Sequence, residues 1–459
     1  MQFRGWLESG RRAGRPGAKA ALTLVLFACA VVAGCSHNRE TKEDKARIPG
    51  ERISVLSYEG RLAADPRIAD LKVQLPKPYE NQAWPQAGGD LTHVMEHLEL
   101  APNPRVAWRA KIGKGSGGVE RLIASPVVAD GKVFALDANN TVSARDMSNG
   151  RTLWQITLKQ KGEKKESGLG GGISYDDGVI YATSGFGFVS AIDAKTGKEK
   201  WRKATGVPMR GAPTIADGRI FAVSYDNQLF AMTTGNGDII WNKVGIAENA
   251  GVIGTASPAV VGETVVVAFS SGEIYAYRVE NGQDIWTDTL SRTDVGLPTP
   301  MSSLNDIDGL PVVDGGNVYA ISQGGRMVAI NLRTGERIWE RNIGGTQTPW
   351  VAGDFIYVLT SDDEVLCLSR RDGRIRWVRE LPDYINPEKR KKFVYWSGPV
   401  LAGDRLVVVS SLGYAVSISP YDGRLLSKIE LPAQGFIAPI VADGTLYLLS
   451  NDAELLALK

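Results

Sequence analysis

Cysteine and histidine are scarce in this chain, with three of each among 459 residues. The histidines, His37, His93 and His97, all precede the repeated part of the sequence, which disfavours histidine acid–base chemistry within the repeats. Cys367 lies in an apolar, strand-like run and is predicted to be a buried, unreactive thiol.

Long apolar runs are also missing: no segment has the 18 consecutive apolar residues that a membrane-spanning helix needs. The charge-free run Ala20–Val32 is shorter and follows a basic stretch, which is typical of a signal peptide. It ends at Gly34-Cys35, a pattern that resembles the bacterial lipobox, in which the cysteine is acylated and becomes the new N-terminus. The alternative is ordinary secretory cleavage beside an incidental cysteine. We therefore expect a lipoprotein signal peptide over residues 1–34 and a lipid-anchored tether over residues 35–83.

The chain lacks a strong charge of either sign. Removing residues 1–34 takes away five basic residues and one acidic residue, so the formal charge changes from +2 to −2. A nearly neutral protein of this kind disfavours nucleic acid as a partner. By the lipoprotein sorting rule, Ser36 in place of Asp implies the outer membrane, with attachment through buried acyl chains at about 0.8 kcal/mol per CH₂.

One unit is repeated through the rest of the chain. Its clearest copy is 213–241, where a Pro opens an apolar run, Gly turns separate short apolar segments, and Gly-x-x-x-Trp closes the unit. Alternating short runs and turns predict successive antiparallel hairpins, and four strands at this period predict a propeller blade. The spacing from the first to the last marker is 28 residues in Pro126–Trp154, Ile173–Trp201, Pro213–Trp241, Pro258–Trp286, Pro311–Trp339, Pro349–Trp377 and Pro399–Ser427.

An eighth unit opens at Pro439 but the chain stops at Lys459, before a fourth strand. The segment 106–108 ends in Trp108 and precedes Pro126 as each Trp precedes the next Pro, so we expect it to supply that strand. The predicted fold is all-β: an eight-bladed propeller of four-stranded antiparallel blades over residues 84–459, with the last blade closed by the N-terminal strand. Closure in this way removes two open sheet edges.

The tryptophans occupy the same position in successive units, which predicts packing between neighbouring blades rather than a ligand platform. A buried Trp→Ala change costs about 3–5 kcal/mol. These structural positions are Trp108, Trp154, Trp201, Trp241, Trp286, Trp339 and Trp377.

The segments between units vary in length, whereas the units do not, and all such links emerge on one face of a propeller. Insertions confined to one face predict a binding face. We expect the residues three positions before each opening marker to ring the mouth of the central channel as a protein-contact surface, with exposed Arg and Trp as anchors. The alternative is that Trp396 and Phe436 plug the channel. The ring consists of Ile123, Gly170, Arg210, Thr255, Asp308, Thr346, Trp396 and Phe436.

The segments 191–201 and 329–339 follow A-x-D/N-x-x-T-G-x-x-x-W, and 84–89 reads Trp-Pro-Gln-Ala-Gly-Gly. Over residues 84–459 the chain resembles the pyrroloquinoline-quinone (PQQ)-like propellers, and within them the BamB family of outer-membrane assembly lipoproteins. The resemblance implies a non-enzymatic scaffold without cofactor, metal or catalytic residues, on the periplasmic face of the outer membrane. It implies docking on the POTRA repeats of the barrel-assembly factor BamA, contact with other Bam subunits, and assistance to nascent outer-membrane proteins. The docking positions that match are Val207, Met209, Arg210, Asp306 and Asp308.

A PQQ-dependent periplasmic dehydrogenase is the alternative within the same resemblance. It would need a clamped quinone, a carboxylate calcium site and an Asp base, and the adjacent cysteines frequent in that branch are missing. Residues 93–97 fit H-x-x-E-H, an inverted zinc-protease motif, but stand in a segment bounded by Gly and Pro rather than on a long helix. The basic run 388–392 is interpreted as solvated, with an anionic lipid or an acidic partner as the alternative.

Overall fold

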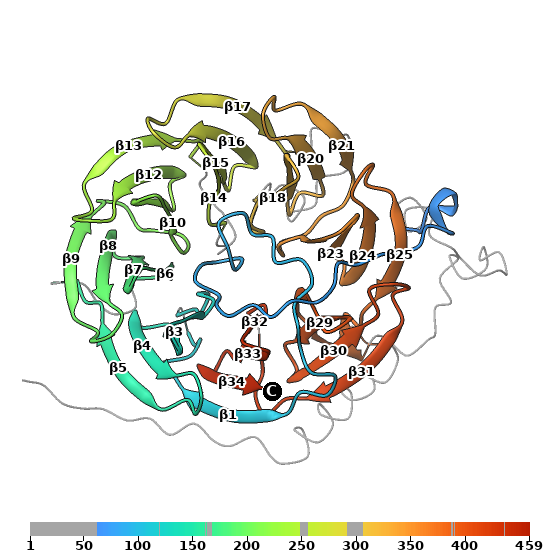
Figure 1. Ribbon diagram of the computed structural model, residues 1–459, viewed down its shortest axis with the longest axis horizontal. Helices are drawn as coiled ribbons and strands as arrows, with labels where there is room; N and C mark the ends of the chain where they lie inside the picture. Colours follow the sequence, from blue (N-terminus) through green and yellow to red (C-terminus); the bar gives the residue numbers. More distant parts are fainter. Residues whose placement is uncertain are drawn as a thin grey trace, which may run out of the picture. The chain divides into compact units, whose positions relative to one another are not determined.

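Eight four-stranded antiparallel sheets are arranged around a central channel in the computed structural model of the chain (Figure 1). The structure describes residues 62–118, 120–160, 162, 168–247, 256–291, 306–386, 389, 391–435 and 437–459. Cys35, the signal peptide and two of the expected channel residues, Thr255 and Phe436, lie outside the described residues. The eight-bladed propeller predicted from the repeat is confirmed.

We number the blades from the first complete sheet. Blade 1 contains β2 (Val127–Ala129), β3 (Lys132–Leu136), β4 (Thr141–Asp146) and β5 (Thr152–Thr157). Blade 2 contains β6 (Gly171–Asp176), β7 (Val179–Ser184), β8 (Phe188–Asp193) and β9 (Glu199–Ala204). Blade 3 contains β10 (Thr214–Ala216), β11 (Arg219–Val223), β12 (Gln228–Thr233) and β13 (Ile239–Val244). Blade 4 contains β14 (Ala259–Val261), β15 (Thr264–Ala268), β16 (Glu273–Arg278) and β17 (Asp284–Thr289).

Blade 5 contains β18 (Val312–Asp314), β19 (Asn317–Ile321), β20 (Met327–Asn331) and β21 (Arg337–Arg341). Blade 6 contains β22 (Trp350–Ala352), β23 (Phe355–Leu359), β24 (Glu364–Ser369) and β25 (Ile375–Glu380). Blade 7 contains β28 (Trp396–Ala402), β29 (Arg405–Ser410), β30 (Tyr414–Ile418) and β31 (Leu425–Glu430), and blade 8 contains β32 (Ile440–Ala442), β33 (Thr445–Leu449), β34 (Glu454–Leu458) and β1 (Val106–Lys111). A short hairpin of β26 (Tyr384–Asn386) and β27 (Lys391–Phe393) lies between blades 6 and 7, and a 3-10 helix, η2, covers Pro66–Ile68.

The local sequence explains the hairpins within each blade. In blade 3, β10 and β11 are joined at Asp217-Gly218, and both residues have positive φ, 47° and 72°. A two-residue turn with two positive φ values matches the twist of the flanking strands, and Asp-Gly adopts it at low cost. The inner and middle strands of the blade are almost wholly buried, whereas the outer strand β13 alternates between exposed and half-buried residues. The core therefore lies between neighbouring sheets.

The two ends of the propeller meet in blade 8. Strand β1 pairs with β34 in antiparallel register, with Trp108 opposite Ala457 and Lys111 opposite Glu454. Arg105 and Lys459 extend the ladder with two more backbone hydrogen bonds, of 2.7 and 2.9 Å. The expected closure of the last blade by the N-terminal strand is thus what the structure contains.

Seven tryptophans of the outer strands reach the next blade in the same way. The indole Nε1 of Trp201 donates to the carbonyl of Thr234 at 3.0 Å, in the turn between β12 and β13. Gly237 in that turn has a positive φ and lies so close to the ring that a Cβ atom would stand 2.6 Å from it. The same bond to the next turn is made by Trp108, Trp154, Trp241, Trp286, Trp339 and Trp377.

The eighth position of this series is Ser427, and its surroundings explain the missing tryptophan. The turn that a tryptophan there would contact lies between the third and fourth strands of blade 8. Those strands, β34 and β1, come from opposite ends of the propeller, so no turn joins them. Ser427 is accordingly exposed.

One segment, residues 81–98, makes hydrogen bonds to all eight blades, and we call it the axial segment. In Figure 1 it is the blue trace that circles inside the ring of sheets. Each contact joins it to an innermost strand or to the residues beside that strand, which would otherwise leave an open edge toward the channel. The partners, from blade 8 through blades 1 to 7, are Asn81 with Val441, Trp84 with Val128, Pro85 with Tyr175, Gln86 with Ile215, Leu91 with Val260, Thr92 with Val313, Glu96 with Trp350, and Leu98 with Leu401.

The segment ahead of the axial segment also contacts the propeller, which corrects the expected boundary at residue 84. Leu62 packs against the apolar cluster of blades 5 and 6, and the backbone N–H of Asp65 donates to the carbonyl of Ile375 at 2.7 Å. Arg376 donates to the carbonyl of Leu71 at 2.9 Å. Residues 62–83 therefore belong to the same compact unit as the propeller.

Candidate functional site

The links at 207–211 and 306–309 lie on the face where blades are joined, and a buried ion cluster connects them. Arg210 stands between blades 2 and 3, whereas Asp306 and Asp308 stand between blades 4 and 5. The Arg210 Nη2 atom donates to Asp306 Oδ1 at 2.5 Å and to Asp308 Oδ1 at 3.0 Å. The sequence-predicted docking residues are thus brought together, although the two links are almost a hundred residues apart.

The backbone fixes Arg210 before its side chain makes any contact. Met209 forms an isolated bridge with Ser224, and the Arg210 N–H donates to the carbonyl of Val223 at 2.9 Å. The Arg210 carbonyl in turn accepts from Gly171. This link is therefore held between blades 2 and 3.

The burial of the cluster corrects the expectation of an exposed anchor. Arg210 is 2% exposed, Asp306 1% and Asp308 8%. Breaking a buried, hydrogen-bonded ion pair costs about 3–5 kcal/mol, far more than the roughly 0.5 kcal/mol of a surface change. Val207 is half-buried and Pro208 is exposed, so these two side chains form the accessible part of the link.

Two carboxylates share one guanidinium here. Burial raises the pKa of Asp308 to about 7, with repulsion from Asp306 adding to the rise and Arg210 opposing it. Among the described residues, Arg210 Nη1 and Asp308 Oδ2 have no hydrogen-bond partner. Burial also raises the pKa of Tyr225, whose backbone N–H bonds to the carbonyl of Pro208. The cluster therefore connects the two links electrostatically, and removal of either the cation or one of the carboxylates is expected to weaken this connection.

The expected ring of residues at the channel mouth is only partly confirmed. Ile123, Asp308 and Thr346 line the channel cavity, as predicted. Trp396 does not: it is 6% exposed, packs edge-on against Tyr414 and donates to the carbonyl of Pro382. It is therefore neither an exposed anchor nor a channel plug, because its side chain belongs to the core of blade 7.

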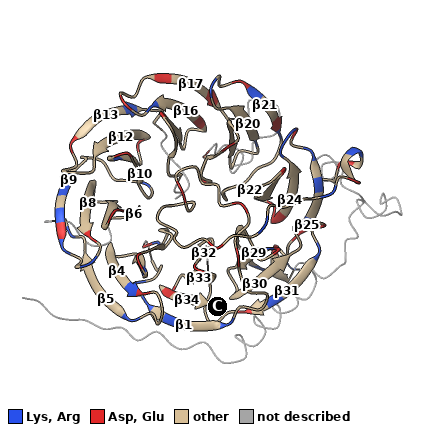
Figure 2. Cartoon of the chain, in the orientation of Figure 1, with Lys and Arg blue, Asp and Glu red and all other residues tan. Residues whose placement is uncertain are grey.

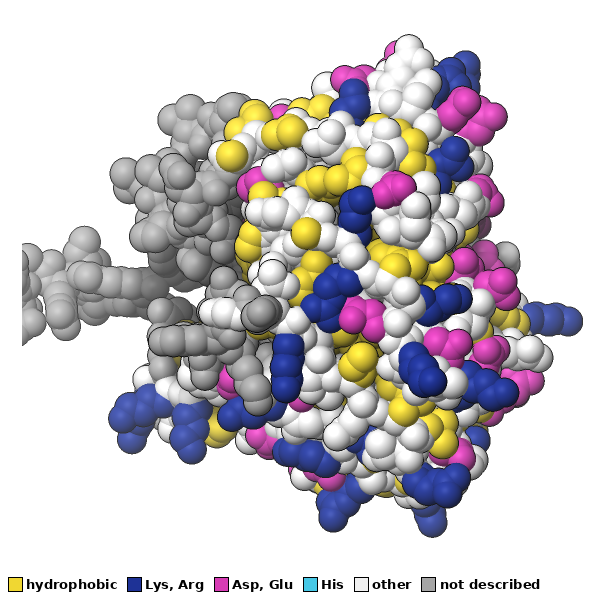
Figure 3. All heavy atoms as spheres, turned by 90° about the vertical axis from the view of Figure 1, so that its left-hand side faces the viewer, with side chains coloured by type: hydrophobic (Ala, Val, Ile, Leu, Met, Phe, Trp, Pro, Cys, Tyr) yellow, Lys and Arg dark blue, Asp and Glu magenta, His cyan; other side chains and the backbone are white. Residues whose placement is uncertain are grey.

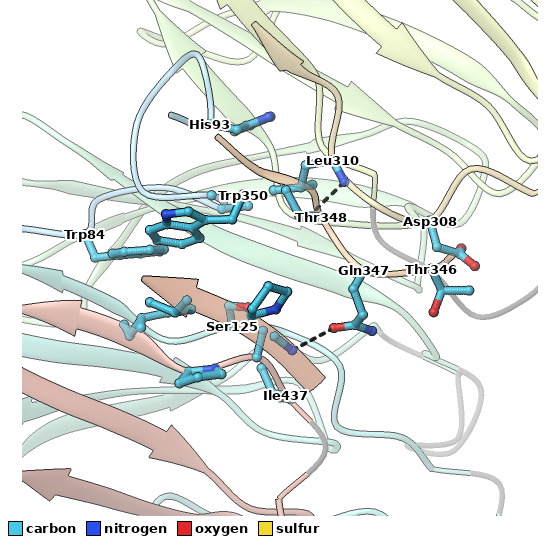
Figure 4. A pocket seen from close by; sticks show the side chains of 18 of the residues that line it. Trp84, His93, Ser125, Asp308, Leu310, Thr346, Gln347, Thr348, Trp350 and Ile437 are labelled. Carbon is cyan, nitrogen blue, oxygen red and sulfur yellow. Dashed lines mark hydrogen bonds between the residues drawn. The ribbon is translucent and has the colours of Figure 1, made fainter. Parts of the chain in front are cut away.

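The central channel contains a cavity of about 320 Å³. Trp84 and His93 of the axial segment line one end of it, and Asp308 and Thr346 lie at the other side in Figure 4. The wall between them includes Trp350 and Gln347, whose Oε1 atom accepts from the Gly398 N–H at 3.2 Å. A mostly apolar cavity with a few polar groups has the general character of a binding pocket. The axial segment, which the sequence marked only by Trp84-Pro-Gln-Ala-Gly-Gly, is what narrows the channel.

The two histidines of the H-x-x-E-H segment serve the propeller framework. His93 Nδ1 lies 2.7 Å from the Pro311 carbonyl, and burial lowers the pKa of this imidazole. His97 Nδ1 lies 2.8 Å from the Pro76 carbonyl, while its Nε2 accepts from the Asp404 N–H at 3.0 Å. Since a carbonyl only accepts, both rings carry their proton on Nδ1 and bind different segments. No group of three His, Cys, Asp or Glu side chains is placed to hold a metal ion within the residues that the structure describes.

Charged residues lie mainly on the outer strands and turns in Figure 2, and the innermost strands carry few of them. The face of the rim seen in Figure 3 intersperses lysines and arginines with acidic and apolar side chains. On the outer strand β13, Ile239 and Ile240 are exposed. In the part of the chain with described structure, no helix is long and apolar enough to cross a membrane.

Comparisons with known proteins agree with this architecture. A family model described as outer membrane protein assembly factor BamB matches residues 100–165, 138–379 and 389–459. The chain is 28% identical to the assembly factor BamB of Yersinia pestis over 360 residues, which are 77% of this chain and 88% of that protein. It is 27% identical to BamB of Escherichia coli K12 over 353 residues, or 76% of this chain and 87% of that protein.

Solved structures show the same fold. The crystal structure of BamB from Moraxella catarrhalis aligns with a TM-score of 0.66 at 20% identity, over 78% of this chain and all of that one. A europium-containing methanol dehydrogenase aligns with a TM-score of 0.62 at 14% identity, over 80% of this chain and 89% of that one. At these identities the likeness concerns the fold alone.

Proposed function

The chain belongs to the family of outer membrane protein assembly factors BamB, and from this premise we propose that it is a non-enzymatic scaffold of outer-membrane barrel assembly. In this role it docks on the periplasmic POTRA repeats of the barrel factor BamA, beside other Bam subunits, and assists the insertion of nascent outer-membrane proteins. The observation that carries the proposal is the match of the family model across nearly the whole propeller.

Docking proceeds through the link at 207–211. Val207 and Pro208 offer the accessible contact, and Met209 beneath them is fully buried. The buried cluster of Arg210, Asp306 and Asp308 holds this link in position, because its hydrogen bonds connect residues 207–211 to the link that precedes blade 5. Arg210 and the two aspartates are therefore positioning residues in this proposal, and the partner touches the surface that they hold in place.

Attachment to the outer membrane uses Cys35 as the acylated residue, with the propeller on the periplasmic side. Support comes from the lipobox-like sequence at Gly34-Cys35 and from the basic and apolar segments before it. Acyl chains hold such a protein on the bilayer without a spanning segment. The proposal assigns no catalytic residue, metal or cofactor.

The test is the affinity of purified BamA POTRA repeats for the wild-type protein and three variants, with the melting temperature measured in parallel. Pro208→Arg changes an exposed side chain, so stability should stay within about 0.5 kcal/mol while affinity falls by more than about tenfold. Arg210→Ala should lower both affinity and stability, since it leaves two buried carboxylates without their cation. Arg424→Ala, on an exposed turn of blade 7, is the matched control and should change neither.

Equal affinity of wild type and Pro208→Arg would reject this docking surface. Absence of any binding by the wild-type protein, with a normal melting temperature, would reject the assembly role itself.

A further inference from the structure

Among the links that the structure describes, the one between blades 6 and 7 is distinguished by a hairpin of its own, β26–β27. Tyr384 pairs with Phe393 and Asn386 pairs with Lys391, so these four side chains share one face of the hairpin. The rings of Tyr384 and Phe393 meet edge-on at 5.2 Å, and Tyr395 follows at 4.9 Å from Phe393. The hairpin thus presents a ladder of three aromatic rings.

The alternation of the strand decides which side of this ladder faces outward. Val394 is fully buried and its N–H donates to the carbonyl of Asp383 at 2.9 Å. Its neighbours point the other way: Phe393 is 43% exposed and Tyr395 55%. Ile385 at the start of the hairpin is 52% exposed. Phe393 and Tyr395 therefore expose neighbouring rings on the same side. Ile385 lies between two residues of the ladder, so it is exposed on the opposite face of the hairpin.

Positive charge accompanies these rings. The segment 384–395 contains four basic residues and one acidic residue. Lys391 and Lys392 are exposed, and neither has an ion-pair partner within the described residues. On the rim, by contrast, several lysines and arginines pair with carboxylates, as Lys203 does with Asp238 at 2.7 Å. The hairpin consequently combines exposed lysines with exposed aromatic rings.

We propose that the hairpin β26–β27, with Tyr395 beside it, is a peripheral contact for an anionic lipid surface. Tyrosine side chains favour the headgroup level of a bilayer, where the ring is buried and its hydroxyl is hydrated, and an adjacent phenylalanine adds apolar area. Each lysine near an anionic leaflet contributes about a fivefold gain in binding. An acidic protein surface would attract the lysines equally, but it gives no comparable reason for the adjacent rings of Phe393 and Tyr395 to be exposed.

The start of the described chain also lies beside blade 6. Asp65 and Leu71 bond to β25 of blade 6, and the hairpin follows the far end of the same strand. Residues 35–61 could span up to about 90 Å when extended, so a lipid on Cys35 alone would not decide which side of the propeller meets the bilayer. A weak contact between the hairpin next to blade 6 and the bilayer would determine which side of the propeller faces the membrane. The inference is independent of the docking proposal, because it concerns lipid and not a protein partner.

The experiment is vesicle co-sedimentation of residues 62–459, which include every strand of the eight sheets and form a separate compact unit without the N-terminal lipid. The protein should bind vesicles that contain phosphatidylglycerol and should not bind vesicles of pure phosphatidylcholine. The binding to the anionic vesicles should weaken as the salt concentration is raised. Lys391→Gln with Lys392→Gln should reduce the partition coefficient about 30-fold. Phe393→Ser, added to this double variant, should reduce the partition coefficient further.

Lys198→Gln with Lys200→Gln is the matched control, because these two exposed lysines lie in blade 2 and the change removes the same charge. It should alter binding by less than about threefold, and all variants should melt as the wild type does, since only exposed side chains change. Three results would overturn the proposal: no wild-type binding to the anionic vesicles, equal binding to both vesicle types, or an equal loss in the control pair.

Discussion

The rim and the channel of this propeller are held together by opposite means. At the rim, one contact is repeated at seven seams: an indole N–H bonds to a carbonyl in the next blade's turn, and in each case a glycine of that turn lies against the ring. In the channel, a single continuous segment visits eight inner strands, and it uses a different residue at each of them. The rim is thus a periodic structure and the channel an aperiodic one.

This difference separates local from global effects. Loss of one tryptophan weakens one seam, whereas the remaining six keep their contacts. The axial segment, on the other hand, connects every blade to its neighbours through one chain. The axial segment also lines one end of the channel cavity, and residues of the links line the other side. A change in the axial segment is therefore expected to affect the face that carries the links, across this cavity.

The largest effect is expected at the rim, at the seam that closes the ring. Trp108→Ala removes a nearly buried indole that packs on Gly150 and bonds to Met147, so we expect a loss of about 3–5 kcal/mol in the free energy of unfolding. Denaturant unfolding measures it. Ser427→Ala is the control at the seam without a turn and should change stability by less than about 0.5 kcal/mol. Equal stability of the two variants would contradict the account of the rim.

A smaller effect is expected in the axial segment. The side chain of Gln86 accepts from the N–H of Ile215 at 2.8 Å and donates to its carbonyl at 3.1 Å, like a strand residue would. Gln86→Met keeps the length of the side chain but leaves both backbone groups without partners, at a cost of about 1–3 kcal/mol. Gln82→Met, an exposed change nearby, is the control. Hydrogen exchange at Ile215 should increase in the first variant only, and unchanged protection there would show that the segment is not needed to cover β10.

The repeat allowed much of this fold to be predicted, for a physical reason. Each blade buries the same kind of face, so Pro126 to Trp154 and its copies keep one spacing, and the closure by Val106–Lys111 follows from counting strands. The path of residues 81–98 could not be predicted, because Asn81, Gln86 and Leu91 share no pattern. Their bonds exist only once the inner strands are in place.

The link region was predicted in position but not in environment. The resemblance to a known family pointed to Arg210, Asp306 and Asp308, and the structure brings them within hydrogen-bonding distance. Their burial was missed because an Arg in a glycine-containing link is normally solvated, and only the approach of two links from different blades removes it from water. The hairpin β26–β27 was missed for a similar reason, since its basic residues mask a short alternation of aromatic side chains.

The most direct test of the central claim is a photo-crosslink from position 208 in living cells. A photoreactive residue in place of Pro208 should form an adduct with the barrel-assembly factor, whereas the same residue in place of Ile240, exposed on the rim strand β13, should form little or none. Adducts from position 240 together with none from position 208 would contradict docking through the face that Arg210 supports.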